Sequence, residues 1–385
     1  MFKDKIRWID IKSSFLFLLA YPIALVRKIR HKDVWLYSER SGEARDNGFW
    51  MYKYTKENHP EQEAYYVIKK DSCDREKLLK YGKTIDFGSF SHYVVYLTAK
   101  KHISAHIDSD SPNSRVSNFL ETHKLLKNKR VFLQHGITKD KISFGYYTVS
   151  RSDIFVCAAR PEYEFCKQEF GYPEGAVKLL GFARFDGLGV CKPQRRILLM
   201  PTWRSWLADI DENEFIKSKY YNVYSDLLNN DILAELLEKN NIDLVFYPHS
   251  DMQKFVHLFK RKSDRIIIKT DKQTDVQELL NNSAMLITDY SSVAFDMAYM
   301  DRPIIYYQFD YDEYREKQHP EGYYSYQNDG FGPICFDVDQ LFSKLKKCVE
   351  INFQNDVFYN KRRNTFFSYN DRDNCSRIYR AISEL

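Results

Sequence analysis

The sequence predicts an α/β protein built from two doubly wound parallel sheets. Short apolar runs alternate with longer segments of helical periodicity along most of the chain, as in strand-helix-strand repeats. The alternation breaks once, in a Gly- and Pro-containing stretch over residues 182–194, and then resumes. The chain of 385 residues is also longer than one ordinary hydrophobic core supports. We therefore expect two domains joined by a linker near residue 190.

The expected strands fall into two sets, one on each side of this linker. Residues 33–188 are expected to form the N-terminal domain and residues 189–355 the C-terminal domain. Residues 356–385 are expected to form one or two helices that cross back onto the first domain. The expected strands are residues 34–38, 64–68, 102–107, 131–134, 153–157 and 177–181 in the N-terminal domain, and residues 196–200, 243–247, 265–269, 285–288 and 303–307 in the C-terminal domain.

The net positive charge of the chain lies in its first 32 residues. They contain eight Lys or Arg against two Asp, whereas the whole chain has a net charge of +5. The rest of the chain is therefore close to neutral, which argues against a nucleic-acid binder because that function needs a basic face on the folded body. The apolar run FLFLLAYPIALV at residues 15–26 is too short to cross a bilayer, which takes roughly 20 residues. We expect residues 1–32 to be an amphipathic anchor on an anionic membrane surface; the alternative is a first helix packed on the body.

The cysteines indicate a reducing compartment. All seven are scattered, and none forms a C-x-x-C pair. The apolar run is followed by RKIRHK rather than by the small residues of a signal-peptide cleavage site. Together with the basic N-terminus, these features predict a peripheral protein on the cytoplasmic face of the cell membrane.

Polar clusters follow the carboxyl ends of five expected strands. They begin at Glu39, His135, Pro201, Pro248 and Asp289. In an open parallel sheet this edge is where ligands bind, and two such sheets that face one another form a cleft between domains. Because capping alone would not gather these clusters at one kind of edge, we expect a ligand site there.

The sequence TDYSS at residues 288–292 joins a buried strand directly to a helix. A helix N-terminus presents unpaired N–H groups and the positive end of the helix dipole, and the hydroxyls of Ser291 and Ser292 add donors. We expect this pair to hold a phosphate, since simple capping needs only one hydroxyl. Asp289 either caps its own turn or orients a neighbour. The chain lacks G-x-x-x-x-G-K-[ST] and G-x-G-x-x-G, so neither a P-loop NTPase nor a standard dinucleotide enzyme is supported.

Two histidines are candidates for acid–base catalysis. Of the ten histidines, His135 and His249 directly follow an expected strand in a polar cluster, one in each domain. Imidazole can take a proton from an attacking hydroxyl near neutral pH or donate one to a phosphate oxygen. The alternative is a hydrogen-bonded turn histidine in each case. His102 and His106 are spaced like metal ligands on a helix, but HISAHI alternates as a strand, so we expect structural roles for them.

No metal site is expected. The acidic clusters DYD at residues 310–312 and DRD at residues 371–373 are more simply surface charges. A cation such as Arg204 can neutralise a diphosphate in place of a metal.

Nearly the whole chain beyond the N-terminal segment resembles the CDP-glycerol glycerophosphotransferases, the membrane-associated primases and polymerases of teichoic acids and related capsules. The segments that carry the resemblance, in order, are SERSGEARDNGFWMYKY, FLQHGITKDK, LLGFARFDGL, LMPTWR, YPHS, LITDYSSVAFDMAYMDRPIIYYQFDYDEY, GYYSY and FGPICFD. The resemblance implies a GT-B-like fold of two Rossmann-like domains facing a cleft, a CDP-linked donor bound mainly by the C-terminal domain, and transfer without a metal or other cofactor. QHGI stands where the family usually has WHGT, a departure that points to a different acceptor pocket. Without the long N-terminal extension of the large polymerases, the chain compares best with a primase or a capsule transferase.

The resemblance also implies roles for individual residues. His135 and His249 correspond to the family's catalytic pair. The residues expected to bind the donor are Thr202, Arg204, Thr288, Asp289, Ser291 and Ser292, and those expected on the acceptor side or elsewhere in the cleft are Glu39, Asp46, Asn47, Gly136 and Arg184.

These residues predict transfer of glycerol phosphate from CDP-glycerol to a hydroxyl of a lipid-linked glycan or of a growing teichoic acid or capsule polymer. His135 removes the hydroxyl proton, the oxygen attacks the β-phosphorus, and CMP leaves. Arg204, His249 and the two serines stabilise the charge on the diphosphate. The alternatives are a CDP-ribitol ribitolphosphotransferase, a GT-B glycosyltransferase that uses a nucleotide sugar, and a non-catalytic nucleotide-binding scaffold. The presence of both histidines and both serines weighs against the scaffold.

Overall fold

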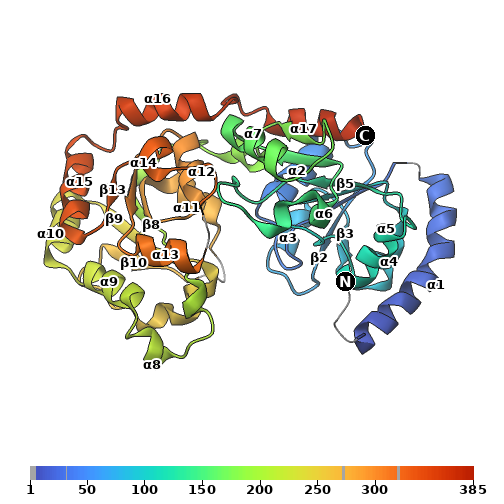
Figure 1. The fold of residues 1–385 in the computed structure, drawn as a ribbon, viewed down its shortest axis with the longest axis horizontal. Helices are drawn as coiled ribbons and strands as arrows, with labels where there is room; N and C mark the ends of the chain where they lie inside the picture. The colour runs from blue at the N-terminus through green and yellow to red at the C-terminus, as the bar shows by residue number, and fades with distance from the viewer. Residues whose placement is uncertain (1–5, 32, 271–273, 319–320) are drawn as a thin grey trace. The chain divides into compact units, whose positions relative to one another are not determined.

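The computed structural model describes residues 6–31, 33–270, 274–318 and 321–385 (Figure 1). The contacts within the chain divide it into two compact units, called unit 1 and unit 2 below. Unit 1 contains Met1–Ile137, Ile142–Asp186 and Asp371–Leu385, and unit 2 contains Thr138–Lys141 and Gly187–Asn370. The main change of unit therefore falls at residues 186 and 187, within the predicted Gly- and Pro-containing stretch.

Unit 1 is built on a parallel sheet. In the part of the chain that the structure describes, this sheet has seven strands in the order β3-β2-β1-β4-β5-β6-β7. Strands β1, β4 and β6 are buried along their whole length, because helices cover both faces of such a sheet. The chain reverses its direction across the sheet between β1 and β4, the kind of switch point at which open sheets bind ligands. The strands are β1 (Trp35–Ser38), β2 (Ala64–Ile68), β3 (Thr84–Asp86), β4 (Lys101–Ser104), β5 (Lys129–Phe132), β6 (Ile154–Cys157) and β7 (Val177–Leu179).

Unit 2 repeats this architecture. Its described residues form a six-stranded parallel sheet in the order β10-β9-β8-β11-β12-β13. The switch point lies between β8 and β11, the two strands that precede Arg204 and the TDYSS sequence. The strands are β8 (Gln194–Leu199), β9 (Asp243–Phe246), β10 (Ile266–Ile268), β11 (Ser283–Thr288), β12 (Ile304–Tyr307) and β13 (Ile334–Cys335).

Helices connect the parallel strands in both units, as parallel pairing requires. The helices of unit 1 are α1 (Trp8–Arg30), α2 (Asn47–Asn58), α3 (Arg75–Leu79), α4 (Phe90–Thr98), α5 (Ser114–Thr122), α6 (Tyr147–Ser150), α7 (Arg160–Glu169) and α17 (Asn374–Ser383). Those of unit 2 are α8 (Glu212–Phe215), α9 (Lys219–Leu228), α10 (Asp231–Asn240), α11 (Val276–Asn282), α12 (Val293–Tyr299), α13 (Tyr311–Lys317), α14 (Tyr326–Asp329), α15 (Val338–Glu350) and α16 (Val357–Phe366). Of the C-terminal helices, α16 thus belongs to unit 2 and α17 to unit 1.

The prediction of two parallel α/β sheets is confirmed, and the main differences concern β3, β13 and the strand predicted over residues 102–107. Strands β3 and β13 were not predicted; they have three and two residues and lie at the ends of their sheets. The strand predicted over residues 102–107 ends at Ser104, so His106 lies in the segment after β4 rather than in the sheet. Short edge strands carry too few residues to show a periodicity.

Helix α1 has two different faces. On its inner face, Ser13, Phe17, Ala20 and Ala24 are buried, and Phe17 packs edge-on against Tyr93 of α4, with ring centroids 4.9 Å apart. The hydroxyl groups of Ser13 and Tyr93 are 3.0 Å apart. Near the end of the helix, Arg27 donates a hydrogen bond to the hydroxyl of Tyr65 on β2. The inner face of α1 therefore agrees with the alternative prediction, a first helix packed on the body of the protein.

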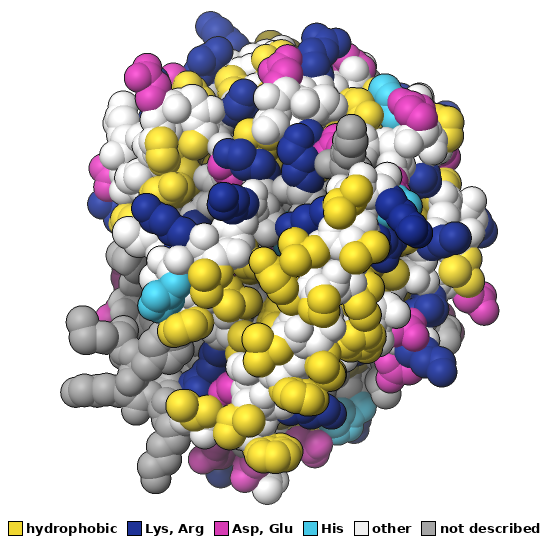
Figure 2. Space-filling model, turned by 90° about the vertical axis from the view of Figure 1, so that its right-hand side faces the viewer, with side chains coloured by type: hydrophobic (Ala, Val, Ile, Leu, Met, Phe, Trp, Pro, Cys, Tyr) yellow, Lys and Arg dark blue, Asp and Glu magenta, His cyan; other side chains and the backbone are white. Residues whose placement is uncertain are grey.

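The outer face of α1 is apolar and exposed (Figure 2). Leu18 is 72% exposed, and Ile29 is 77% exposed. By length and composition alone, the 23-residue helix α1 is long and apolar enough to cross a membrane, although the apolar run at residues 15–26 is too short to do so by itself. Residues 1–5 and 32 of the predicted anchor lie outside the described residues. The other large apolar residues exposed on this helix are Trp8, Ile9, Ile11, Phe15, Leu19, Tyr21, Ile23, Leu25 and Val26.

Candidate functional site

The backbone around His135 is held by side chains from two other segments of unit 1. Asn47, at the start of α2, donates to the carbonyl oxygen of Gln134 at 2.7 Å. Arg184 donates from Nη1 to the carbonyl oxygen of His135 at 2.9 Å. The backbone N–H of Arg184 in turn donates to the side-chain oxygen of Asn47 at 3.0 Å. Three of the predicted cleft residues, Asp46, Asn47 and Arg184, therefore meet at the loop that follows β5.

Asp46 completes this arrangement. Its carboxylate accepts from the backbone N–H of Asn47 at 2.8 Å, which caps α2, and pairs with Nη1 of Arg184 at 2.9 Å. The same guanidinium nitrogen therefore joins a carboxylate to the His135 carbonyl. Gln134 has a positive φ of 58°, so the chain turns sharply just before the histidine. Gly136 follows as a half-buried residue.

Glu39 supports the loop after β1. It is fully buried, and its carboxylate accepts from the backbone N–H groups of Arg45 at 2.7 Å, Asp46 at 2.9 Å and Phe49 at 2.7 Å. Burial, and then the negative charge of Asp46, raise the pKa of Glu39 to about 8, against the lowering effect of the three N–H donors. Glu39 is thus a structural partner of the loop.

The ring of His135 stacks on a second histidine. The imidazole rings of His106 and His135 lie 4.6 Å apart and 7° from parallel. Although His135 as a residue is exposed, protein atoms packed around its ring lower its pKa below the ordinary value of 6.5, and the charge of Asp46 opposes this effect. His135 is therefore neutral at neutral pH, the form that can accept a proton. His106 was not predicted as a site residue, because the segment HISAHI alternates like a strand.

In unit 2, the TDYSS loop is fixed by a buried group of charges. Arg204, which follows β8, has no exposed surface, and its Nη2 lies 2.8 Å from Oδ2 of Asp289. Its Nε lies 2.7 Å from Oδ2 of Asp310, which follows β12. Burial alone would lower the pKa of Arg204, but the charges of the two carboxylates outweigh it and raise that pKa. This Arg204 group joins the ends of three neighbouring strands.

Asp289 both caps its own turn and orients a neighbour. Its Oδ1 accepts from the backbone N–H of Tyr290 at 2.6 Å and from that of Thr202 at 2.8 Å. The hydroxyl of Thr288 donates to the carbonyl oxygen of Met200 at 2.7 Å. Both of the alternatives given for Asp289, capping its own turn and orienting a neighbouring segment, are therefore correct.

Two aromatic rings pack against the guanidinium of Arg204. Tyr290 stacks on Tyr314 of α13, with ring centroids 3.7 Å apart and planes 11° from parallel. The guanidinium carbon of Arg204 lies 5.1 Å from the centroid of each ring. The hydroxyl of Tyr290 donates to Asp310 at 3.1 Å.

The expectation that DYD at residues 310–312 is surface charge is wrong for Asp310. Asp310 is 5% exposed and paired with Arg204, whereas Asp312 is exposed. Asp310 follows β12 at the same sheet edge as the other clusters, so the strand-end argument would have found it. Arg204 donates every bond that the structure gives it to oxygens of the protein, and its predicted contact with the donor diphosphate stays a prediction.

The two serines lie at the start of α12 and are half-buried. The hydroxyl oxygen of Ser291 accepts a long bond of 3.4 Å from the N–H of Val293. Ser292, the N-cap residue, makes no side-chain cap bond within the described chain. Strong capping therefore does not account for this pair.

His249 follows β9 and is the N-cap residue of the 3-10 helix η4 (Ser250–Leu258). It is half-buried, and its Nδ1 accepts from the N–H of Asp251 at 3.3 Å. Its ring stacks loosely on Trp203, with centroids 6.0 Å apart. Both members of the predicted catalytic pair thus lie after a strand, one in each unit.

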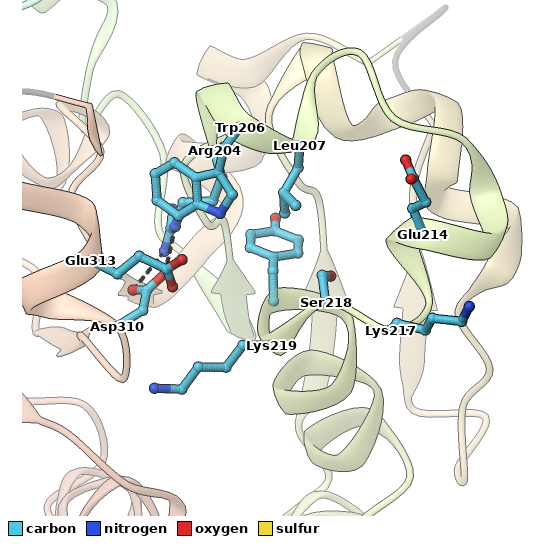
Figure 3. A pocket seen from close by; sticks show the side chains of 10 residues that line it. Arg204, Trp206, Leu207, Glu214, Lys217, Ser218, Lys219, Asp310 and Glu313 are labelled. Atoms are coloured by element: carbon cyan, nitrogen blue, oxygen red, sulfur yellow. Dashed lines mark hydrogen bonds and ion pairs between the residues drawn. The ribbon is translucent and has the colours of Figure 1, made fainter. Parts of the chain in front are cut away.

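A cavity of about 290 Å³ lies next to Arg204 (Figure 3). Its lining includes the buried Asp310 and the side chains of Trp206, Lys219 and Glu313. The lining includes none of His249, Ser291 and Ser292, so this cavity is not the predicted phosphate site. Among the described residues, no three His, Cys, Asp or Glu side chains gather in an arrangement that could hold a metal ion.

Sequence comparison extends over almost the whole chain. A family model described as CDP-Glycerol:Poly(glycerophosphate) glycerophosphotransferase matches residues 19–384. The minor teichoic acid biosynthesis protein GgaB of Bacillus subtilis (strain 168) is 33% identical over 394 residues, which cover 100% of this chain and 43% of that protein. The chain spans less than half the length of the first curated relatives it matches.

Solved structures show the same fold. A histidine-to-alanine variant of the wall teichoic acid polymerase TagF gives a TM-score of 0.70 at 18% identity and covers 98% of each chain. The UDP-GlcNAc 2-epimerase from Neisseria meningitidis, bound to UDP-GlcNAc, gives a TM-score of 0.53 at 9% identity and covers 92% of this chain and 100% of that one. The GT-B-like fold of two Rossmann-like domains is confirmed, and the predicted cleft that these domains face stays a prediction.

Proposed function

Because the chain belongs to the CDP-glycerol:poly(glycerophosphate) glycerophosphotransferase family, we propose that it transfers glycerol phosphate from CDP-glycerol to an acceptor hydroxyl and releases CMP. The acceptor is a lipid-linked glycan or a growing teichoic acid or capsule polymer. The observation that carries the proposal is the His135 loop, whose backbone is fixed by Asn47 and Arg184 while the histidine itself is exposed. A fixed, accessible and neutral imidazole is what a general base requires.

In the proposed reaction, His135 accepts the proton of the acceptor hydroxyl. The oxygen then forms a bond to the β-phosphorus of CDP-glycerol, and the bond from this phosphorus to the bridging oxygen breaks, so that CMP leaves with the bonding electron pair. His249, Ser291 and Ser292 stabilise the charge on the diphosphate through hydrogen bonds. The proposal needs no metal ion or other cofactor.

Arg204 and Asp289 support the donor site in this proposal. Their ion pair fixes the turn that leads to Ser291, together with the contact between Asp289 and Thr202. Hydrogen bonds stabilise a transition state best when the donors are already in place, because no energy is then spent on reorienting them during the reaction. Arg204 has no exposed surface, so direct contact with the diphosphate would require the atoms that cover its guanidinium to move.

Helix α1 supports attachment to the cytoplasmic face of the cell membrane. Its inner face is packed on unit 1, and its outer face presents large apolar side chains such as Phe15, Leu18 and Ile29. Lys28 and Arg30 are exposed in its last turn and can contact anionic head groups. The helix would therefore lie in the membrane surface rather than cross the bilayer, which places the enzyme close to a lipid-linked acceptor.

The donor sugar alcohol is the main alternative. A CDP-ribitol donor uses the same cytidine diphosphate and the same attack on phosphorus, so the contacts above do not separate it from CDP-glycerol. A nucleotide sugar donor would instead require attack on carbon.

The test is turnover with each donor. The purified protein is incubated with a lipid-linked acceptor and either CDP-glycerol, CDP-ribitol or a nucleotide sugar, and CMP release and product mass are measured. We expect CMP together with a product heavier by one or more glycerol phosphate units. Turnover with CDP-ribitol alone would show that the donor is CDP-ribitol and not CDP-glycerol. Transfer of a sugar would show that the protein is a glycosyltransferase, and the absence of turnover with every donor would refute the proposal that it is an enzyme.

A further inference from the structure

The chain leaves unit 1 for four residues directly after the His135 loop. Thr138–Lys141 belongs to unit 2, although the segments on both sides of it belong to unit 1. Thr138 is three residues from His135. What holds this short segment in unit 2 therefore also limits where His135 can move.

The segment is held by a buried ion-pair group. Asp140 is 4% exposed, and its Oδ1 lies 3.0 Å from Nη1 of Arg315 on α13. The other carboxylate oxygen pairs with Nζ of Lys139, which is also buried. The guanidinium carbon of Arg315 lies 5.8 Å from the ring centroid of Tyr326.

The backbone of the segment is enclosed as closely as its side chains. A Cβ atom added at Gly322 would lie 2.2 Å from the carbonyl oxygen of Lys139 and 2.8 Å from Cα of Asp140. Only glycine permits this approach, because both neighbouring atoms belong to the backbone. The segment thus sits against α13, Gly322 and the Tyr326 ring.

The same helix also supports the TDYSS loop. Arg315 directly follows Tyr314, whose ring stacks on Tyr290 at 3.7 Å, and Tyr290 directly precedes Ser291. A continuous series of contacts in unit 2 therefore leads from the two serines, through α13, to Asp140.

Stability alone is a weak reason for such a group. Removing two charges from water is expensive, and a buried ion pair often adds little net stability compared with apolar residues of similar size. It does favour one arrangement, because a shift of the segment breaks the pair between Asp140 and Arg315. Asp140 then keeps Lys139, and Arg315 keeps the more exposed Glu321, which lies 3.7 Å away. In this place the arrangement that it specifies is the path of the chain three to five residues after His135.

We propose that Asp140 is a positioning residue for the proposed transfer reaction, and that its ion pair with Arg315 couples the loop carrying the base His135 to the donor loop of unit 2. This inference rests on the proposed function. The loop is then fixed from two directions, by Arg184 at the His135 carbonyl and by Arg315 at Asp140.

The test compares Asp140→Asn with Asp140→Glu in the full chain. Asp140→Asn removes the charge at nearly constant size, so we expect kcat to fall by about 10- to 100-fold, because a misplacement of about 1 Å can cost 10²-fold. The affinity for CDP-glycerol in calorimetry without acceptor should change less than about twofold, and Asp140→Glu should recover part of kcat. Asp243→Asn, which removes the partner of Arg265 at 3.0 Å elsewhere in unit 2, should leave kcat unchanged.

Hydrogen exchange of the peptide covering residues 131–142 provides a second readout that does not depend on turnover. We expect faster exchange at residues 133–137 in Asp140→Asn, and slower exchange in the wild type when CDP-glycerol is added. Wild-type protein without CMP release would refute the proposed function, and the exchange result would then still decide whether the two loops are coupled. The inference is overturned if Asp140→Asn keeps wild-type kcat and exchange, or if it loses donor affinity as strongly as it loses kcat.

Discussion

Replacement of Arg204 by methionine tests whether the buried ion pairs fix the TDYSS loop. Arg204 has no exposed surface and pairs with Asp289 at 2.8 Å and with Asp310 at 2.7 Å. Methionine fills much of the same volume but carries no charge, so two buried carboxylates lose their counterion. Removing one partner of a buried ion pair costs about 3–5 kcal/mol. With two carboxylates affected, we expect a loss near 5 kcal/mol, a large part of the stability of an ordinary domain of ~5–15 kcal/mol.

The assay should report on unit 2 by itself, since proteins with two compact units need not unfold in one step. Hydrogen exchange followed by mass spectrometry, at increasing urea, gives the opening free energy of peptides from β8 and β11. Arg265→Met is the matched control, because Arg265 pairs with Asp243 at 3.0 Å but both side chains are about one-third exposed. An exposed pair contributes about 0–1 kcal/mol. A loss below 1 kcal/mol for Arg204→Met would refute the reasoning.

Three further predictions concern the donor loop, the helix α1 and the base. Ser291→Ala combined with Ser292→Ala should weaken CDP-glycerol binding in calorimetry, because bonds to a charged group contribute about 1.5–3 kcal/mol each, while stability changes by no more than about 1 kcal/mol. Leu18→Ser combined with Ile29→Ser should reduce binding to anionic liposomes by tenfold or more, since burying each side chain contributes about 1.5–3 kcal/mol. Turnover should fall as pH decreases through the lowered pKa of His135, so the acid limb of the pH profile should lie below 6.5.

Each of these predictions has a control. Ser325 caps α14 by accepting from the N–H of Asn328 at 3.3 Å, so Ser325→Ala should lower stability without changing donor affinity. Val357 is 84% exposed on α16, and Val357→Ser should not change liposome binding. Unchanged donor affinity in the serine variant, unchanged sedimentation with liposomes in the α1 variant, or an acid limb centred above 6.5 would each contradict the corresponding prediction.

The central strands of both sheets were predictable because they are buried on both faces. Helices cover both faces of a parallel sheet, so its central strands appear as unbroken apolar runs such as residues 285–288, which lie inside β11. The strands β3 and β13 lie at the sheet edges and have too few residues to show this signal. Helix α1 shows a related limit, because composition cannot tell which apolar residues face unit 1 and which face outward.

The site was predictable only as far as strand ends identify it. His135, His249 and Asp289 were predicted to follow strands, and in the structure they follow β5, β9 and β11, respectively. The pairing of Arg204 with Asp310 joins residues that are 106 positions apart, and no sequence spacing encodes it. The stacking of His106 on His135 likewise depends on the neighbouring positions of β4 and β5 in the sheet.

The most direct test of the central claim is the turnover of His135→Ala. CMP release from saturating CDP-glycerol, with a saturating lipid-linked acceptor, is compared for wild type, His135→Ala and His123→Ala, whose exposed histidine lies after α5. Loss of a general base typically lowers the rate about 10²- to 10⁴-fold. We predict a loss in this range for His135→Ala with nearly unchanged donor affinity, and wild-type turnover for His123→Ala. Near-normal turnover of His135→Ala would contradict the assignment of His135 as the base.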